Sequence, residues 1–305
     1  MNSIELLRVH PLHEPAAGPG AYLKGRNGAE KALGEDQKLY VFKSPQYGRN
    51  RHPLTSLEVE KAIAREVVAS HIMVDEFKLS GIPYQEGLVQ SQEGHLEKAV
   101  ICPYVPDLAT LCEIPVEKIK NPQEAVSQCI VKGWLGEWGT ILNNSNVFVK
   151  KDGTVLAGDF GEAFKKGIRF RPVSFPRFKG FPKANFTVMN QYANPSNVSP
   201  MAEKIRNLSD GEIRGMVHKY GTEYTSFWNR ELEDQFTQVL RDNRDELRKE
   251  NVFEGFYKGF HPFIKPPLSS LIGAASVYVR APLAEALRAL ENCFPKKSTV
   301  KGGQK

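Results

Sequence analysis

Several features that would place a chain in a particular class of protein are missing from this sequence. No apolar run approaches the about 20 residues that a membrane-spanning helix requires. The first segment, MNSIELLRVHPLHEP, has no basic stretch followed by a long apolar run, so we expect no secretory signal peptide. The chain also contains no internal repeat. We therefore expect a cytoplasmic protein that does not interact with membranes.

The chain is also poor in cysteine, with only four in 305 residues. None forms a Cys-x-x-Cys pair, and no cluster of cysteine and histidine has the spacing of a zinc site. We expect reduced thiols, as in a cytosolic protein, rather than disulfides or a structural metal. The residues are Cys102, Cys112, Cys129 and Cys293.

The composition is that of a globular protein, and its charge balance is basic. Apolar residues make up 41% of the chain, which is enough to bury a sizeable core. The formal net charge of +6 favours anionic partners such as nucleotides, phosphates or nucleic acid, without choosing among them. Part of this excess lies in residues 296–305, which we expect to be a disordered basic tail.

The first third of the sequence predicts mainly strands. Apolar residues at helical spacing predict one helix there, over Leu57–Phe77, with Thr55 or Ser56 as its N-cap. The expected strands are Ile4–Val9, Ala21–Gly25, Lys38–Ser44, Leu88–Gln90 and Ala99–Cys102.

The pattern becomes helical after Pro103–Pro106, which we interpret as a hinge. Helices are expected over Pro122–Gly136, Leu208–Glu250 (starting near Ser209) and Pro282–Cys293, with a hairpin of Val147–Val149 and Val155–Ala157 around Asp152-Gly153. The sequence therefore predicts an α+β fold with two lobes. Residues 1–103 would form a strand-rich N-lobe, and residues 104–295 a helical C-lobe.

The most informative segment is Asp159-Phe160-Gly161, which directly follows a predicted strand. An Asp-Phe-Gly in this position is the Mg²⁺-binding signature of kinases, although the triplet alone is far more often a simple turn, and only its context favours the kinase interpretation. Asn144 and Asn146 precede the predicted hairpin, where kinases place a second, neutral metal ligand. Asparagines also occur often in caps and turns.

A lysine and an acidic residue in the first lobe can complete a phosphate site. Lys43 ends an apolar strand, where its ammonium can contact nucleotide phosphates or simply extend to solvent. A buried ammonium requires a carboxylate partner, and Glu66 on the following helix is the first candidate, with Glu58 and Glu60 as alternatives. Gly25 and Gly28 lie where a turn could cover phosphates, but their spacing is not that of a glycine-rich loop.

Taken in order, these segments resemble the HipA-like kinases, which are distant relatives of the phosphatidylinositol 3- and 4-kinases. The similarity covers about residues 20–250 and depends on several degenerate motifs rather than one. They are Tyr-Val-Phe-Lys43, Glu66-Val-Val-Ala, Gly81-Ile-Pro83, Trp134-Leu-Gly-Glu-Trp, the asparagine-rich loop, Asp152-Gly153 and Gly158-Asp159-Phe-Gly161.

The resemblance implies a two-lobed, protein-kinase-like fold that binds ATP and Mg²⁺. It implies that Lys43 binds the α- and β-phosphates, that Glu66 holds Lys43, and that Asp159 binds Mg²⁺. Asn144 or Asn146 would be the second metal ligand, with the resemblance favouring Asn144. The main chain around Tyr104 and Val105 would bind the adenine.

The sequence departs from the family at the catalytic base. The family places an aspartate five residues before its metal-binding asparagine, but counting back from Asn144 or Asn146 gives Gly139 or Ile141. The nearest carboxylate is Glu137, which either replaces the base or is a residue at a helix end. The leading hypothesis is an atypical Ser/Thr protein phosphotransferase with an unidentified protein substrate or partner.

Two alternatives remain open. A pseudokinase would bind nucleotide and act as a regulatory or scaffold protein. A basic nucleic-acid-binding protein would use residues 169–179, where basic and aromatic side chains alternate. The same segment also lies where a kinase would place its activation segment.

Overall fold

The fold was taken from a computed structural model. It describes residues 6–15, 29–45, 53–90, 94–110, 114, 116–137, 147–164 and 195–249. These residues all belong to one compact unit of the chain.

The first part of the chain forms a five-stranded sheet that closes on itself in the order β1-β2-β3-β5-β4. Four of the pairings are antiparallel, and a parallel pairing of β1 with β4 closes the barrel. The strands are β1 (Leu7–Pro15), β2 (Glu30–Gly34), β3 (Leu39–Lys43), β4 (Gln85–Gln90) and β5 (Leu96–Pro103). Small, branched and aromatic side chains fill its interior: Val9, Ala32, Phe42, Val89, Ala99 and Ile101.

Closure depends on a close approach of backbones at Gly87 of β4. A Cβ atom there would lie 2.1 Å from the Ile101 side chain and 2.8 Å from the carbonyl oxygen of Leu7. Both distances are too short for any other residue. A glycine at this position therefore lets β1 lie directly beside β4.

The helix predicted after the first strands is present as α1 (Ser56–His71) and continues into the π-helical turn η1 (Ile72–Glu76). Thr55 is its N-cap, as predicted. The main-chain N–H of Glu58 donates to the Thr55 hydroxyl (3.3 Å), and the Glu58 carboxylate accepts from the N–H of Thr55 (2.8 Å). This reciprocal pair fixes where the helix begins.

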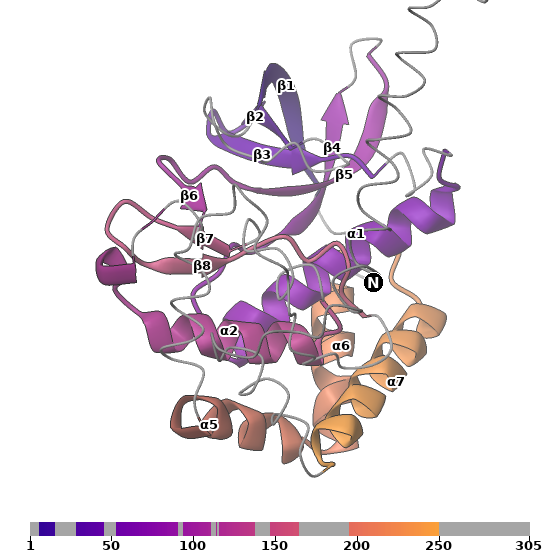
Figure 1. Ribbon diagram of the computed structural model, residues 1–305. Coiled ribbons are helices and arrows are strands. Elements are labelled where there is room, and N and C mark those ends of the chain that lie inside the picture. Colours follow the sequence, from indigo (N-terminus) through magenta and orange to yellow (C-terminus); the bar gives the residue numbers. More distant parts are fainter. Residues whose placement is uncertain are drawn as a thin grey trace, which may run out of the picture. The chain divides into compact units, whose positions relative to one another are not determined.

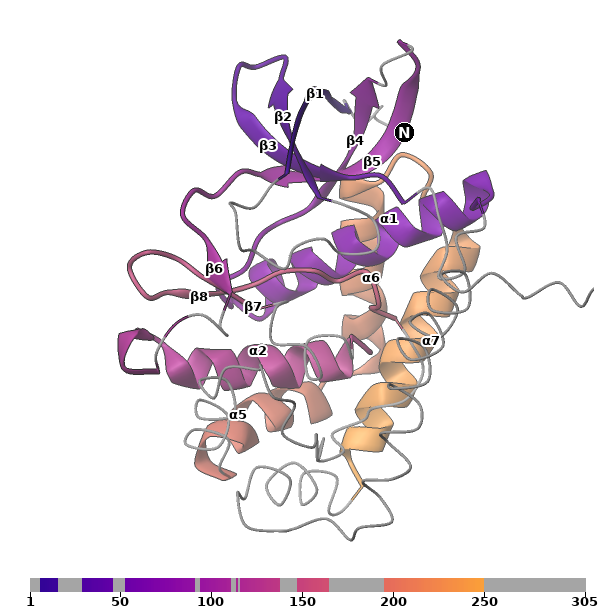
Figure 2. The same ribbon diagram turned by 45° about the horizontal axis from the view of Figure 1, so that its top comes forward.

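The remaining described elements are a small sheet and four helices. The sheet has the order β6-β7-β8, from Ala109–Thr110, Val147–Val149 and Val155–Ala157. The helices are α2 (Pro122–Trp134), α5 (Pro195–Arg206), α6 (Asp210–Tyr224) and α7 (Arg230–Leu247), and a short 3-10 turn, η2 (Val116–Lys118), precedes α2. In Figures 1 and 2, α1 lies directly below the barrel and crosses α6, in agreement with its contacts to β4, β5 and α6.

One hydrophobic core joins α1 and β5 to the helices that follow. The buried side chains of α1, such as Ile63 and Val67, belong to the same cluster as Trp134 of α2 and Phe236 of α7. Trp134 is fully buried, and its indole N–H donates to the Leu240 carbonyl (3.0 Å). The division at residue 103 therefore separates a strand-rich part, which has a small core of its own inside the barrel, from a helix-rich part, while the largest hydrophobic core spans this division.

Several predicted elements agree with the structure, and others need correction. The strands near residues 38–44, 88–90 and 99–102, the helix of residues 122–136 and the hairpin of residues 147–157 are all present. The first strand spans Leu7–Pro15, so it extends past the predicted end at Val9. β2, β6 and α5 were not predicted. Ala21–Gly25 and Pro282–Cys293 lie outside the described residues.

The single helical region predicted over Leu208–Glu250 is in fact two helices, α6 and α7. Ser209 starts α6 with a capping box of its own, and Asn229 caps α7 by accepting from the N–H of Leu232 (3.0 Å). Between them Ser226 donates its hydroxyl to the buried carboxylate of Glu86 on β4 (2.9 Å). The chain therefore leaves the helix to reach the sheet.

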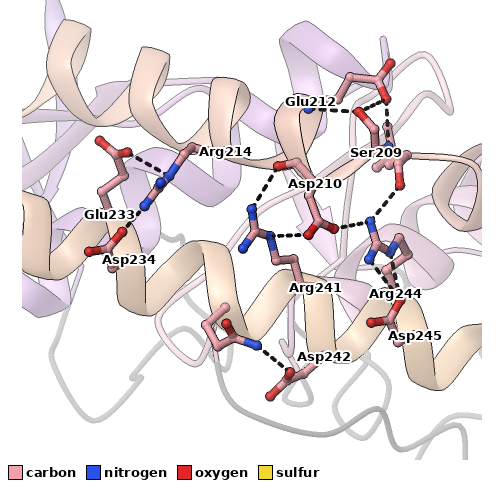
Figure 3. A network of polar contacts seen from close by, with 12 residues as sticks. Ser209, Asp210, Glu212, Arg214, Glu233, Asp234, Arg241, Asp242, Arg244 and Asp245 are labelled. Atoms are coloured by element: carbon pink, nitrogen blue, oxygen red, sulfur yellow. Dashed lines mark hydrogen bonds and ion pairs between the residues drawn. The ribbon is translucent and has the colours of Figure 1, made fainter.

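Ion pairs join α6 to α7 along their polar faces. Figure 3 shows Asp210, at the start of α6, between Arg241 (3.3 Å) and Arg244 (2.8 Å) of α7. Asp210 thus places a negative charge at the helix N-terminus, where the helix dipole favours it. These contacts hold the two helices side by side.

Candidate functional site

Three of the residues singled out in the sequence meet at one place. The ammonium of Lys43, at the end of β3, lies 2.8 Å from Oδ1 of Asp159 and 3.2 Å from Oε2 of Glu66 on α1. These residues come from three separate segments of the chain. The alternatives to Glu66 have other contacts: Glu58 belongs to the cap of α1, and Glu60 pairs with Lys98 (2.7 Å). The predicted partnership of Lys43 with Glu66 is confirmed.

The Lys43 ammonium and the carboxylates of Asp159 and Glu66 shift one another's pKa values. Burial alone would lower the pKa of Lys43, but the carboxylates of Asp159 and Glu66 reverse this and hold it well above its usual value. The Lys43 ammonium lowers the pKa of Asp159 by more than burial raises it. Burial raises the pKa of Glu66, and Lys43 offsets this only in part. At neutral pH the site therefore contains a charged lysine beside an ionised Asp159.

The turn that carries Asp159 has an unusual backbone conformation. Asp159 follows β8 with φ of 54°, in the left-handed region that few residues other than glycine adopt. Its N–H donates to the hydroxyl of Tyr84 (3.1 Å). Phe160 points into the core, fully buried and edge-on to the Tyr84 ring. The turn thus separates a buried aromatic ring from a carboxylate that is 38% exposed.

The oxygen atoms around Gly161 suit a hard divalent cation. A Cβ at Gly161 would lie 3.3 Å from Oε1 of Glu66 and 3.8 Å from Oδ1 of Asp159, so both carboxylates face this glycine. Mg²⁺ prefers carboxylate oxygens and usually takes only one or two from the protein. Asp159 and its surroundings therefore fit such an ion. No group of three or more His, Cys, Asp or Glu residues with metal-site geometry occurs in the part of the chain that the structure describes.

Sequence reasoning missed Lys132 of α2, which lies under the turn. Its ammonium donates to the carbonyl oxygens of Gly158 and Asp159 and lies 4.6 Å from the centre of the Phe160 ring. Its side chain is completely buried. The available signal was a lysine directly after the apolar Cys129-Ile130-Val131 run of a helix.

Glu137, the candidate base, forms a hydrogen bond that holds the backbone in place. It is 1% exposed, and its carboxylate accepts from the main-chain N–H of Glu162 (2.7 Å). Its own N–H donates to the carbonyl of Lys132 (2.8 Å). Glu137 thus ties the end of α2 to the segment after Asp159. Its catalytic role stays a prediction, and this geometry does not favour it.

The segment expected to bind adenine follows β5. The N–H of Tyr104 donates to the carbonyl of Leu39 (3.0 Å), so this amide is already used within the sheet. Of the two main-chain amides predicted for adenine, that of Val105 is the better candidate. The contribution of both residues to nucleotide binding stays a prediction.

Other residues named from the sequence lie outside the described part of the chain. They are Gly25, Gly28, Asn144, Asn146 and the basic aromatic segment of residues 169–179. Their predicted roles in covering phosphate, binding metal or binding nucleic acid stay predictions. In the segments that the structure describes, no helix is long and apolar enough to cross a membrane.

Comparison with known proteins gives little further guidance. No protein-family model matches the chain, and no curated protein matches it. Among solved structures, the chain is similar to the MAP kinase LmaMPK10 from Leishmania major, at 10% identity and a TM-score of 0.32. The similarity covers 87% of this chain and 84% of that one. A score of this size does not establish a common fold, so the interpretation of the site depends on the contacts described above.

Proposed function

We propose that this protein binds ATP together with Mg²⁺ in the manner of a kinase, as an atypical, HipA-like protein. The observation that carries the proposal is the bridge of Lys43 between Glu66 and Asp159. Three segments far apart in the sequence bring a cation and two carboxylates together, in the roles that kinases give to a phosphate lysine, its glutamate partner and a metal-binding aspartate.

Each residue of the bridge has a defined task in this proposal. Lys43 contacts the α- and β-phosphates, and Glu66 keeps its ammonium charged and oriented. Asp159 supplies oxygen to Mg²⁺, whose contribution is to neutralise charge on the phosphates. Val105 offers its main-chain N–H to the adenine. Asn144 or Asn146 completes the metal coordination.

The buried position of Glu137 supports a second form of the proposal. In this form the protein binds nucleotide but transfers phosphate slowly or not at all. Gly139 and Ile141 provide no base, and the Glu137 carboxylate is buried and accepts a main-chain N–H. Positioning and electrostatics account for most of phosphoryl transfer, so a missing base lowers the rate without removing binding. A cytoplasmic regulatory protein that recruits a protein partner is consistent with this arrangement.

Thermal unfolding with and without Mg·ATP tests binding. A ligand that binds only the folded state adds about 2.7 kcal/mol to stability at a hundredfold excess over its Kd, and the midpoint rises accordingly. Asp159→Ala should remove the Mg²⁺-dependent part of the shift. Asp152→Ala is the matched control, because Asp152 is an exposed aspartate in the hairpin turn just before the site. Equal shifts in both variants and in wild type would contradict the proposal.

A phosphate-transfer assay on the same sample separates the two forms of the proposal. Glu137→Gln keeps an oxygen that can accept the Glu162 N–H but removes a charge that favours the charged form of buried Lys132, so the folding of this variant is checked first by its thermal unfolding midpoint. We expect any transfer activity of the wild type to be unchanged in this variant. A large loss of transfer would restore Glu137 as the base and favour the phosphotransferase.

The nucleic-acid alternative is tested with the same variant of the metal site. Binding to single-stranded nucleic acid through residues 169–179 would survive Asp159→Ala. The bridge of Lys43 favours nucleotide binding over this alternative. Strong binding of a single strand, with no thermal shift by Mg·ATP in the wild type, would reverse that order.

A further inference from the structure

The Asp159 turn is held from two sides by side chains that sequence reasoning did not single out. On one side the buried ammonium of Lys132 donates to the carbonyl oxygens of Gly158 and Asp159. On the other side the hydroxyl of Tyr84 accepts from the N–H of Asp159 (3.1 Å). Together they satisfy the main-chain groups on both sides of the Asp159 Cα.

These contacts matter because the turn adopts an unfavourable conformation. Asp159 has a left-handed φ of 54°, which a residue with a side chain keeps only where its surroundings impose it. A change of this φ would move the carboxylate relative to Lys43, which it now contacts. Tyr84 also borders the site directly, with its ring 5.8 Å from the Lys43 ammonium.

The position of Lys132 is costly for a charged group. The side chain has no exposed surface, and burial lowers its pKa, although the carboxylates of Glu137 and Asp159 favour the charged form. An apolar residue of similar length would fill this space at no such cost. A lysine here is therefore explained by what its ammonium does for the carbonyl groups of the turn.

We infer that Lys132 and Tyr84 are positioning residues, which hold the Asp159 turn so that its carboxylate faces Lys43 and the bound metal ion. This inference rests on the proposed function, because it concerns the metal-dependent part of nucleotide binding. By this inference, α2 and the segment before β4 contribute to Mg²⁺ binding through the position of Asp159, without contacting the nucleotide.

The test measures how much Mg²⁺ strengthens ATP binding. The Kd of ATP is measured by calorimetry with saturating MgCl₂ and again with EDTA, and the ratio of the two is the metal increment. Coupled ligands typically strengthen each other by about 5- to 150-fold. We expect such an increment in the wild type, almost none in Lys132→Met, and a reduced one in Tyr84→Phe. ATP binding in EDTA, which depends on Lys43, should change little.

A purely structural role of Lys132 would not reduce the metal increment while leaving ATP binding in EDTA unchanged. A second lysine provides the control. Lys98 of β5 also pairs with a carboxylate, Glu60 (2.7 Å), and lies over an aromatic ring, that of Phe227 (4.5 Å). Lys98→Met should alter the free energy of unfolding but leave the metal increment intact. Lys132→Met combined with Glu137→Gln guards against misfolding, because it removes both members of a buried charge pair.

The outcomes separate this inference from the proposed function. A wild type that does not bind ATP overturns both. A wild-type increment that survives in the folded Lys132 variants overturns the inference alone. If neither Lys132 variant folds, Tyr84→Phe decides: an unchanged increment overturns the inference, and a reduced one supports it.

Discussion

Removing the Lys43 ammonium should destabilise the protein, because it leaves two carboxylates without their cation. Lys43→Met keeps the length of the side chain but leaves Glu66, whose side chain is only 10% exposed, facing Asp159. Breaking a buried pair by removing one partner costs about 3–5 kcal/mol. Because Asp159 is 38% exposed and partly screened by solvent, we expect a loss of about 2–4 kcal/mol at neutral pH.

The loss should depend on pH in a defined direction. Without Lys43, burial and the charge of Asp159 both raise the pKa of Glu66 above its value in the unfolded chain. The folded state then binds more protons than the unfolded state, so its stability rises as the pH falls through the folded pKa of Glu66 toward the unfolded one. The deficit relative to wild type should therefore be smaller at about pH 5 than at neutral pH.

Denaturant unfolding of a small set of variants checks this reasoning. Lys43→Met combined with Glu66→Gln removes the uncompensated charge and should be more stable than Lys43→Met alone, while still failing to bind ATP. Lys38→Met is the control, because Lys38 forms only an exposed pair with Asp36 (3.1 Å) and should unfold like the wild type. A Lys43→Met variant as stable as wild type at both pH values would refute the reasoning.

Further predictions concern the surroundings of the site. Burial raises the pKa of the Cys102 thiol to about 12 and of the Cys129 thiol to about 11. Both should resist alkylation at neutral pH until the protein unfolds, as mass spectrometry after timed labelling would show; rapid labelling of the native protein would contradict this. Gly158→Ala places a Cβ 2.4 Å from the Phe148 ring and should cost about 1–3 kcal/mol of unfolding free energy, while an unchanged denaturation midpoint would mean that the ring moves freely. Thr55→Ala should cost about 1 kcal/mol by removing the N-cap of α1, measurable by the same unfolding experiment, and no loss would mean that the cap is dispensable.

The sequence was most informative where local patterns determine structure. Thr55 and Glu58 have the spacing of a capping box, and Asp152-Gly153 joins two short apolar runs, so the helix start and the hairpin were both predictable. The contact of Lys43 with Glu66 was predictable because a lysine at the end of a strand and a glutamate on the next helix need one another if both are buried.

Features that depend on contacts between distant segments were not predictable. The parallel pairing of β1 with β4 joins residues about 80 positions apart, and no local pattern encodes it. The break between α6 and α7 follows from the contact of Ser226 with Glu86, which the helical pattern does not reveal. In the sequence, Lys132 looks like a polar residue at the edge of a helix. Its burial under the Asp159 turn is a contact between distant segments, which no local pattern reveals.

The closed barrel limits how the strand-rich part can meet other proteins. Because β1 pairs with both β2 and β4, each described strand of this sheet has a neighbour on both sides. A peptide that binds by adding a strand needs an unpaired edge, and the same edge is where chains aggregate. Partners that approach this sheet must therefore recognise its side chains or loops rather than extend its backbone ladder.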